Sequence, residues 1–194
     1  MTSRTPDPVI ETARLRLRFV TEADAATVVR LMTPAVSRWL ASWPLSLDEA
    51  AAASRLGRMR ESAEQGRLLP FAIERRDSGE MMGLVMVARA SDDARRGGLG
   101  YWLGEPYHHH GYMSEAVAAA VGEGFVRFDL EAVEAGAQPD NISSLALMRR
   151  LGMRPIGERS IWADARGREE VCAYFEITRR EHDARRTGDA NRTA

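Results

Sequence analysis

The sequence predicts one α/β domain of the α+β type, built on a mixed, mostly antiparallel sheet of six to seven strands with helices on both faces. The chain has 194 residues, of which 44% are apolar, enough for one packed core but short for two. Its periodic segments follow the order strand, two helices, three strands, helix, strand, helix, two strands. That order lacks the strict strand–helix alternation of a doubly wound sheet, so most neighbouring strands are expected to be antiparallel.

The N-terminal third is expected to supply one strand and two helices. Residues 1–11 are polar and contain prolines, which predicts a flexible terminus. Residues 14–19 alternate polar and apolar side chains with period two, as in a half-buried strand. The helix that follows is expected to end before Pro34. A capping box of Ser46 and Glu49, with Glu49 at the third helical position, begins the next helix.

The middle of the chain predicts three strands and a long helix. Gly66 is a suitable C-cap for the preceding helix, because glycine adopts the left-handed backbone that such caps need. Residues 68–75 and 82–89 are apolar runs joined by a short Asp-Ser-Gly turn, which predicts a hairpin. Residues 99–103 form a third apolar strand, and an alanine-rich helix follows at 115–128.

The loop between that third strand and the long helix predicts an anion site. The first four N–H groups of a helix have no partner within the helix, and the helix dipole adds positive charge there. Gly111 lets the backbone approach a ligand closely, because no side chain stands in the way. The residues themselves therefore indicate a site for a diphosphate or a carboxylate.

The last part of the chain predicts one more strand and helix, a hairpin and a tail. Residues 179–194 are charged and contain no aromatic side chain, which predicts disorder. The other segments are a strand at 132–138, a helix capped by Asp140 or Asn141 that runs to Leu151, and strands near 153–158 and 171–178.

Composition limits the classes of protein and partner. Arginine supplies all 27 basic residues against 28 acidic ones, and the net charge of −1 lacks the basic excess of a general nucleic-acid binder. One cysteine, Cys172, excludes an internal disulfide, fits a reducing compartment and is read as a packed side chain. No membrane-spanning segment or secretory leader is evident. We expect a soluble, cytoplasmic protein that binds neither nucleic acid nor membrane.

Three segments give the chain a family resemblance. They are Thr12-Ala-Arg-Leu-Arg-Leu-Arg18, Leu99-Gly-Tyr-Trp-Leu-Gly104 with His108-His-His-Gly-Tyr-Met-Ser-Glu-Ala116, and Pro139-Asp-Asn-Ile-Ser-Ser144 with Leu151-Gly-Met153. In this order and spacing the chain resembles the GNAT acetyltransferases, and within them the RimJ/RimL-like branch, which includes ribosomal-protein N-terminal acetyltransferases. The resemblance implies a GNAT domain over 12–178. His108 and Met113 depart from the Arg or Gln and the Gly or Ala usual there, and binding is expected to survive both changes.

The resemblance implies acetyl-CoA as co-substrate and places it. It would lie where two central parallel strands, 99–103 and 132–138, splay apart. Its pantetheine arm would pair with the backbone like an added strand, and its pyrophosphate would lie on the N–H groups of 109–114. The implied cofactor-binding residues are Trp102, Leu103, His108, His109, His110, Gly111, Tyr112, Met113, Ser114 and Asn141.

The same resemblance suggests a catalytic group. Ser144 matches the family's Asn-x-x-Ser position, as a hydroxyl that donates to the departing thiolate, and ordinary helix capping is the alternative for Asn141 and Ser144. No side chain stands out as a general base, and Glu134 and Glu158 are not assigned that role. Trp39 and Trp43 are expected to line the acceptor pocket or to form a lid packed on the sheet.

Metal binding and the choice of acceptor complete the expectations. The adjacent histidines at 108–110 are not expected to hold a metal, since neighbouring side chains in a loop diverge. The function expected is transfer of an acetyl group to a primary amine, foremost the N-terminal α-amine of a protein or peptide. The alternatives are a small-molecule amine or antibiotic as acceptor, and a non-catalytic acyl-CoA-binding regulatory domain. A homodimer is possible by analogy with the branch.

Overall fold

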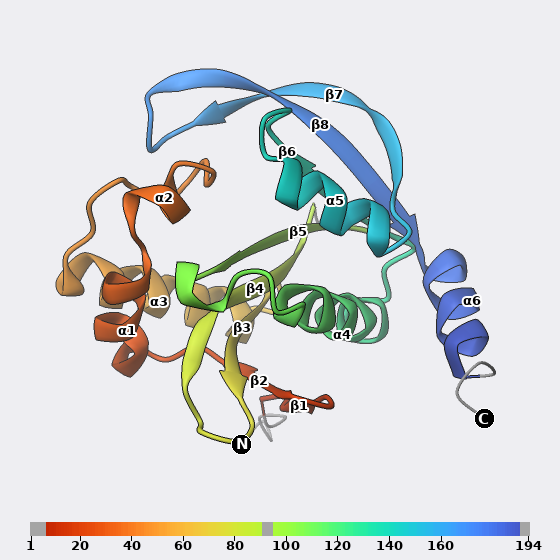
Figure 1. Ribbon diagram of the computed structural model, residues 1–194, viewed down its shortest axis with the longest axis horizontal. Coiled ribbons are helices and arrows are strands. Elements are labelled where there is room, and N and C mark those ends of the chain that lie inside the picture. The colour runs from red at the N-terminus through yellow and green to blue at the C-terminus, as the bar shows by residue number, and fades with distance from the viewer. Residues whose placement is uncertain (1–6, 91–94, 191–194) are drawn as a thin grey trace.

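A mixed sheet runs through the molecule in the strand order β1-β2-β3-β4-β5-β6-β8-β7 (Figure 1). The computed structural model describes residues 7–90 and 95–190. Every neighbouring pair of strands is antiparallel except β5 and β6. The strands are β1 (Ile10–Glu11), β2 (Leu15–Phe19), β3 (Leu68–Arg75), β4 (Met81–Arg89), β5 (Arg96–Leu103), β6 (Ala132–Ala137), β7 (Arg154–Ala163) and β8 (Arg168–Thr178).

Helices cover both faces of the sheet. The consecutive residues Phe71, Ala72 and Ile73 of β3 are all fully buried, and successive strand side chains point to opposite faces. In Figure 1, α1 and α3 lie next to each other against the sheet, and α4 packs against the sheet apart from these two helices. The helices are η1 (Glu22–Asp24), α1 (Ala25–Leu31), α2 (Pro34–Ser37), α3 (Glu49–Glu64), η2 (Glu105–Tyr107), α4 (Tyr112–Arg127), α5 (Ile142–Arg150) and α6 (Arg179–Ala190).

The fold class is confirmed, while the described residues form eight strands rather than six to seven. The additional strand is β1, which lies within the N-terminal segment predicted to be flexible. Ile10 pairs with Leu17 and Glu11 with Arg16, so the outer edge of β2 is covered. Two residues are too few for a period to be visible in the sequence. Residues 1–6 of the predicted flexible segment lie outside the described residues.

The two parallel strands at the centre separate, as expected. β5 and β6 pair only over Arg96–Gly98 and Ala132–Glu134. Beyond Gly98, β5 continues to Leu103 and β6 to Ala137 without pairing to each other. The backbone groups on these inner edges are therefore left for another partner, since strand edges carry unpaired donors and acceptors.

Two local boundaries differ from the sequence prediction. The N-cap of α3 is Asp48, not Ser46, because the Asp48 carboxylate accepts the N–H of Ala51 at 2.7 Å. Glu49 is accordingly the first helical residue rather than the third. Pro34 begins α2 instead of only ending the helix before it, since proline is well tolerated at the first helical position. The C-cap of α3 is Gln65, and Gly66, predicted for that role, follows it with the expected left-handed backbone at φ +68°.

The C-terminal segment is a helix up to residue 190, where the sequence predicts disorder. Thr178 and Glu181 form a capping box, in which the Glu181 carboxylate accepts the Thr178 N–H at 2.8 Å and the Thr178 hydroxyl accepts the Glu181 N–H at 3.3 Å. Arg179 donates to the Leu130 carbonyl at 2.8 Å, and the buried His182 ring packs on Phe125. The charged composition of this segment gives no indication of these contacts. Residues 191–194 lie outside the described residues.

The ion pair of Arg18 with Asp24, the N-cap residue of α1, gives a testable stability prediction. Burial alone would raise the pKa of Asp24, but hydrogen bonds from Arg18 and the Thr21 N–H outweigh it and hold that pKa below its ordinary 3.8. Asp24→Asn should lower the free energy of unfolding by about 1–3 kcal/mol at pH 7. Because the pKa of Asp24 is lower in the folded than in the unfolded state, its ionised carboxylate stabilises the folded protein above pH 3.8. This contribution is lost as the pH falls through the folded-state pKa. Urea unfolding should show the wild-type advantage shrinking below about pH 4; an equal difference at pH 3 and pH 7 would contradict it.

Candidate active site

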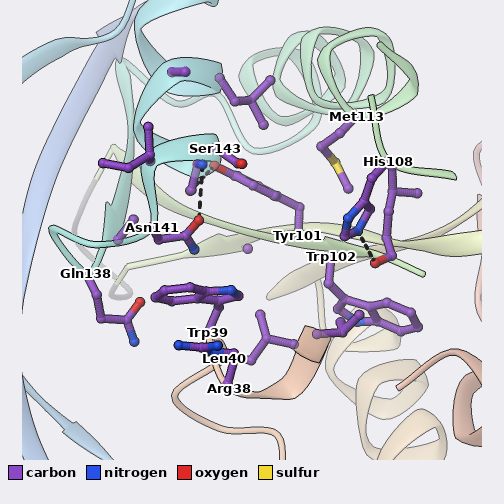
Figure 2. A pocket seen from close by; sticks show the side chains of 18 of the residues that line it. Arg38, Trp39, Leu40, Tyr101, Trp102, His108, Met113, Gln138, Asn141 and Ser143 are labelled. Atoms are coloured by element: carbon purple, nitrogen blue, oxygen red, sulfur yellow. Dashed lines mark hydrogen bonds between the residues drawn. The ribbon is translucent and has the colours of Figure 1, made fainter. Parts of the chain in front are cut away.

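A cavity of about 940 Å³ opens where β5 and β6 part (Figure 2). Four structural features form its wall: the inner edge of β5, the N-terminus of α5, the loop that precedes α4, and the loop that follows α2. The tip of the β7–β8 hairpin adds Ile161 and Cys172. The splay of the sheet, the histidine-rich loop and the Asn-x-x-Ser helix, three features far apart in the sequence, are therefore parts of one site.

The loop before α4 offers a run of free donors. Gly111 is the N-cap of α4 at φ +78°, and His109 also has a left-handed backbone at φ +65°. No described residue accepts a hydrogen bond from the backbone N–H groups of 109–114, and the glycine has no side chain with which to cap the helix. These donors lie at the positive end of a 16-residue helix. The arrangement fits an anion with several oxygen atoms.

An ion pair with the N-terminal strand region holds this loop in place. The Glu115 carboxylate accepts the Thr12 hydroxyl at 2.6 Å, the Arg14 N–H at 2.8 Å and the Arg14 Nε at 2.7 Å. Arg14 also donates to the His110 carbonyl at 2.9 Å and lies over the Tyr112 ring. The negative charge of Glu115 at the helix terminus is thus neutralised locally, so it opposes anion binding little.

The three histidines point in different directions. His108 Nε2 lies 2.9 Å from the Leu103 carbonyl and the ring lies on the cavity wall beside Met113 (Figure 2). The His110 ring packs on Tyr112, and His110 is not part of the wall. Within the described residues no three His, Cys, Asp or Glu side chains gather as a metal site would require.

A pair of hydroxyl groups bridges the two sides of the splay. Tyr101 Oη on β5 lies 2.6 Å from Ser144 Oγ on α5. Burial raises the pKa of Tyr101 to about 12, so the phenol keeps its proton at neutral pH. Asn141 caps α5, its Oδ1 accepting the Ser144 N–H at 3.2 Å. The capping alternative for Asn141 is therefore observed, whereas the Ser144 hydroxyl has a side-chain partner and lies on the cavity wall.

The two tryptophans of the loop after α2 differ in setting. Trp43 is 2% exposed, packs edge-on against Trp102 with ring centroids 5.7 Å apart, and lies under Arg55. Trp39 is half-buried, lies against Arg38 and extends between Asn141 and that guanidinium (Figure 2). Both belong to the wall, but Trp43 is mainly a core anchor, whereas Trp39 presents a half-buried indole to the cavity.

Comparison with known proteins assigns the family. Residues 14–154 match the acetyltransferase (GNAT) domain. The chain belongs to the GNAT acetyltransferase family. It is 26% identical to the N-acetyltransferase p20 of Bacillus licheniformis over 88% of this chain and 96% of that one, and 27% identical to YoaA of Bacillus subtilis over 77% and 85%. Both relatives are named as uncharacterized N-acetyltransferases.

Solved GNAT structures agree with the fold. RimJ of Mycobacterium smegmatis, solved with CoA-disulfide, superposes with a TM-score of 0.73 at 26% identity, over 86% of this chain and 83% of that one. RimL, a ribosomal L7/L12 alpha-N-protein acetyltransferase solved with coenzyme A, gives 0.75 at 18% identity over 88% and 98%, a likeness of fold alone. The chain is thus an N-acetyltransferase of a fold that uses acetyl-CoA, with RimJ and RimL among its structural neighbours.

The other candidate groups of this GNAT domain lie away from the reacting position or are engaged. Burial alone would raise the pKa of Glu134, but hydrogen bonds from Arg159 and Arg96 keep it below its ordinary value, and Glu134 is not on the cavity wall. Glu158 is not on the wall either. Cys172 is on the wall but buried, and burial raises the pKa of its thiol, which disfavours the nucleophilic thiolate.

Sequence reasoning missed two functional contacts. Tyr101 was read only as part of an apolar strand, since nothing in its spacing indicates that it meets a serine 43 positions away. The hydrogen bond from Arg166 to the Leu40 carbonyl, next to Trp39, could not be predicted either, because it depends on how the β7–β8 hairpin folds over this loop.

Residues 7–90 and 95–190 contain no helix long and apolar enough to cross a membrane.

Proposed function

We propose that the chain transfers the acetyl group of acetyl-CoA directly to a primary amine, with the N-terminal α-amine of a protein or peptide as the preferred acceptor. One observation carries the proposal. The free N–H groups of His109 and of residues 111–114 and the Ser144 hydroxyl lie on one cavity wall, at the end of the splay between β5 and β6. An anion cradle, an open strand edge and a proton donor are what binding and cleaving a nucleotide thioester require.

The co-substrate would extend along this wall. The pyrophosphate would accept hydrogen bonds from the N–H groups of 109–114, with His108 and Met113 beside it. The pantetheine arm would pair with the open edge of β5 at Tyr101 and Leu103, in the way that a peptide adds to a sheet edge, whereas the backbone groups of Trp102 face Leu84 of β4. Asn141 would orient the start of α5 next to that arm.

Ser144 would act when the carbon–sulfur bond breaks. The amine nitrogen attacks the thioester carbonyl, the acetyl group moves to nitrogen, and the thiolate takes a proton. Either hydroxyl can donate in the contact between Tyr101 and Ser144, and the proposed step uses the direction in which Tyr101 donates to Ser144 Oγ and leaves the serine hydrogen for the departing sulfur. A thiol pKa of about 8.5 makes this assistance useful rather than essential. Nitrogen releases its proton to water and water returns one to Ser144 Oγ, so the net change is transfer of one proton from nitrogen to sulfur.

The acceptor class follows from the absence of a strong base. Among the described residues of the wall, the carboxylates are Glu105 and Asp140, and Glu105 is engaged by the Thr33 hydroxyl. An α-amine has a pKa of about 7.7–8.0 and a lysine amine about 10.4, so near neutral pH the α-amine is already partly unprotonated. The wall also carries His108 and His109, but both lie in the loop proposed for the pyrophosphate and His108 Nε2 is engaged by the Leu103 carbonyl, so a site with little help from a base favours an α-amine over lysine.

A panel of amines tests the proposal by release of free thiol. Peptides with free N-termini should be acetylated with kcat/KM rising as the pH passes through about 8, where the α-amine loses its proton. The same peptides with a blocked N-terminus and an internal lysine should react at the background rate of hydrolysis. Faster turnover of amino acids, polyamines or antibiotics would assign a small-molecule acceptor. Binding of coenzyme A without turnover of any amine would reduce the protein to an acyl-CoA-binding domain.

A further inference from the structure

The acceptor end of the cavity is formed by a segment without regular structure. Residues 38–43 follow α2 and supply Arg38, Trp39, Leu40 and Ala41 to the wall. Internal backbone bonds hold such a segment weakly, so contacts with other elements must fix it. One of these contacts is Trp43, inserted into the core against Trp102. A second is Arg55, which donates to the Ser42 carbonyl, and a third lies at the tip of the β7–β8 hairpin.

The tip of the β7–β8 hairpin arches over α2 (Figure 1) and donates hydrogen bonds to the backbone of residues 38–43. The Ala165 N–H donates to the Ala41 carbonyl at 3.1 Å. Arg166 Nη1 donates to the carbonyls of Arg38 and Leu40, at 3.2 Å each. The two acceptors lie on either side of Trp39, so one guanidinium sets where that indole lies in the cavity.

The guanidinium is itself held by a carboxylate. Glu170 accepts Arg166 Nε and Nη2 at 2.7 Å each, a bidentate pair whose side chains are only 12% and 10% exposed. The hydrogen bonds from Arg166 lower the pKa of Glu170 to about 2, with Gln138 and Arg168 adding to the effect, so the carboxylate stays charged. Gln138 Nε2, at the end of β6, donates to Glu170 at 2.8 Å and joins β6 to the same junction.

Neither member of this pair lines the cavity, although both hold residues that do. We propose that Arg166, supported by Glu170, is a positioning residue for the acceptor amine, because it fixes the backbone on both sides of Trp39. This inference rests on the proposed function, together with the expectation from the sequence that Trp39 lines the acceptor pocket. Its effect should therefore fall on the acceptor and leave the binding of coenzyme A, at the other end of the wall, unchanged.

The test compares Arg166→Gln with Arg168→Gln. Arg168 also donates to Glu170, at 2.9 Å and 3.0 Å, but it is 69% exposed and gives nothing to the Trp39 segment. Arg166→Gln should raise KM for the amine about tenfold with the Kd for coenzyme A unchanged, as expected for loss of charge-assisted hydrogen bonds. Arg168→Gln should leave both constants at the wild-type values. Arg166→Lys should not rescue KM, because an ammonium lacks the planar fork.

A second readout needs no activity. Trypsin cleaves after Arg38, and release of the segment should speed that cleavage in Arg166→Gln, but not in Arg168→Gln, by about tenfold. Glu170→Gln keeps the arginine and its hydrogen bonds to the two carbonyls, so it should give a smaller increase in the rate of cleavage after Arg38. This variant replaces Arg166→Gln in the test if Arg166→Gln does not fold. Equal cleavage rates in all variants, or an unchanged amine KM, would overturn the inference. A wild-type protein that acetylates no amine would instead refute the proposed function, and the cleavage rates would still judge the anchor.

Discussion

Replacing Gly111 by valine should remove measurable binding of coenzyme A. Gly111 has φ +78°, a backbone conformation that a β-branched residue adopts only with strain. A Cβ built there meets only Arg14 Nη2, at 3.6 Å, so the substitution does not collide with the folded chain. The loop is expected to relax toward negative φ, and the N–H groups of 109–114 would then no longer converge on one anion.

Calorimetry gives the size of this effect and its control. Losing two or more charge-assisted hydrogen bonds corresponds to a Kd at least about 100-fold higher. Gly79→Val is the matched control, because Gly79 has φ +70°, meets nothing within 4 Å of its Cβ and lies in the β3–β4 turn away from the cavity. It should lose stability but keep the wild-type Kd. A Gly111→Val protein that binds as tightly as wild type would show that the anion lies elsewhere.

Replacing Ser144 by alanine should slow turnover without weakening co-substrate binding. The hydroxyl lies on the cavity wall 2.6 Å from Tyr101, and a positioned proton donor typically contributes about 10²–10⁴-fold to a rate. The thiol is acidic enough to leave partly unaided, so the fall in kcat should lie at or below the lower end of that range, at about 10–100-fold. The KM for acetyl-CoA should be nearly unchanged.

The pH dependence and a neighbouring serine make this prediction specific. Above about pH 8.5 a thiolate persists without a proton, so the defect of Ser144→Ala should shrink there. Ser143 also lies on the wall but is exposed and makes no hydrogen bond with Tyr101, so Ser143→Ala should be nearly silent. Equal defects in the two variants, or a Ser144→Ala enzyme as fast as wild type, would remove Ser144 from the reaction.

Local signals in the sequence predict the free donors before α4, because that loop is made of neighbouring backbone groups. Gly111 and the helix that follows it are enough to imply free donors. The Asn141 cap is similarly local, with its partner three residues away at Ser144. Both could therefore be predicted from spacing and turn chemistry.

Contacts between distant segments could not be predicted in this way. Arg166 and Leu40 are 126 positions apart, and their contact depends on the course of a whole hairpin. Helix α6 was missed for a different reason, since its Thr178 and Glu181 capping box is present in the sequence but the charged composition outweighed it. The pairing of β1 with β2 involves only Ile10 and Glu11, too short a segment for periodicity.

The structure of the complex with acetyl-CoA tests the central proposal most directly. The pyrophosphate oxygens are predicted to lie within hydrogen-bond distance, about 2.7–3.2 Å, of backbone nitrogens of 109–114. The sulfur is predicted beside Ser144, with the pantetheine arm along Tyr101 and Leu103 and the acetyl group facing Trp39. Electron density that places the nucleotide thioester elsewhere, or a pyrophosphate held by side chains away from Gly111, would contradict the account.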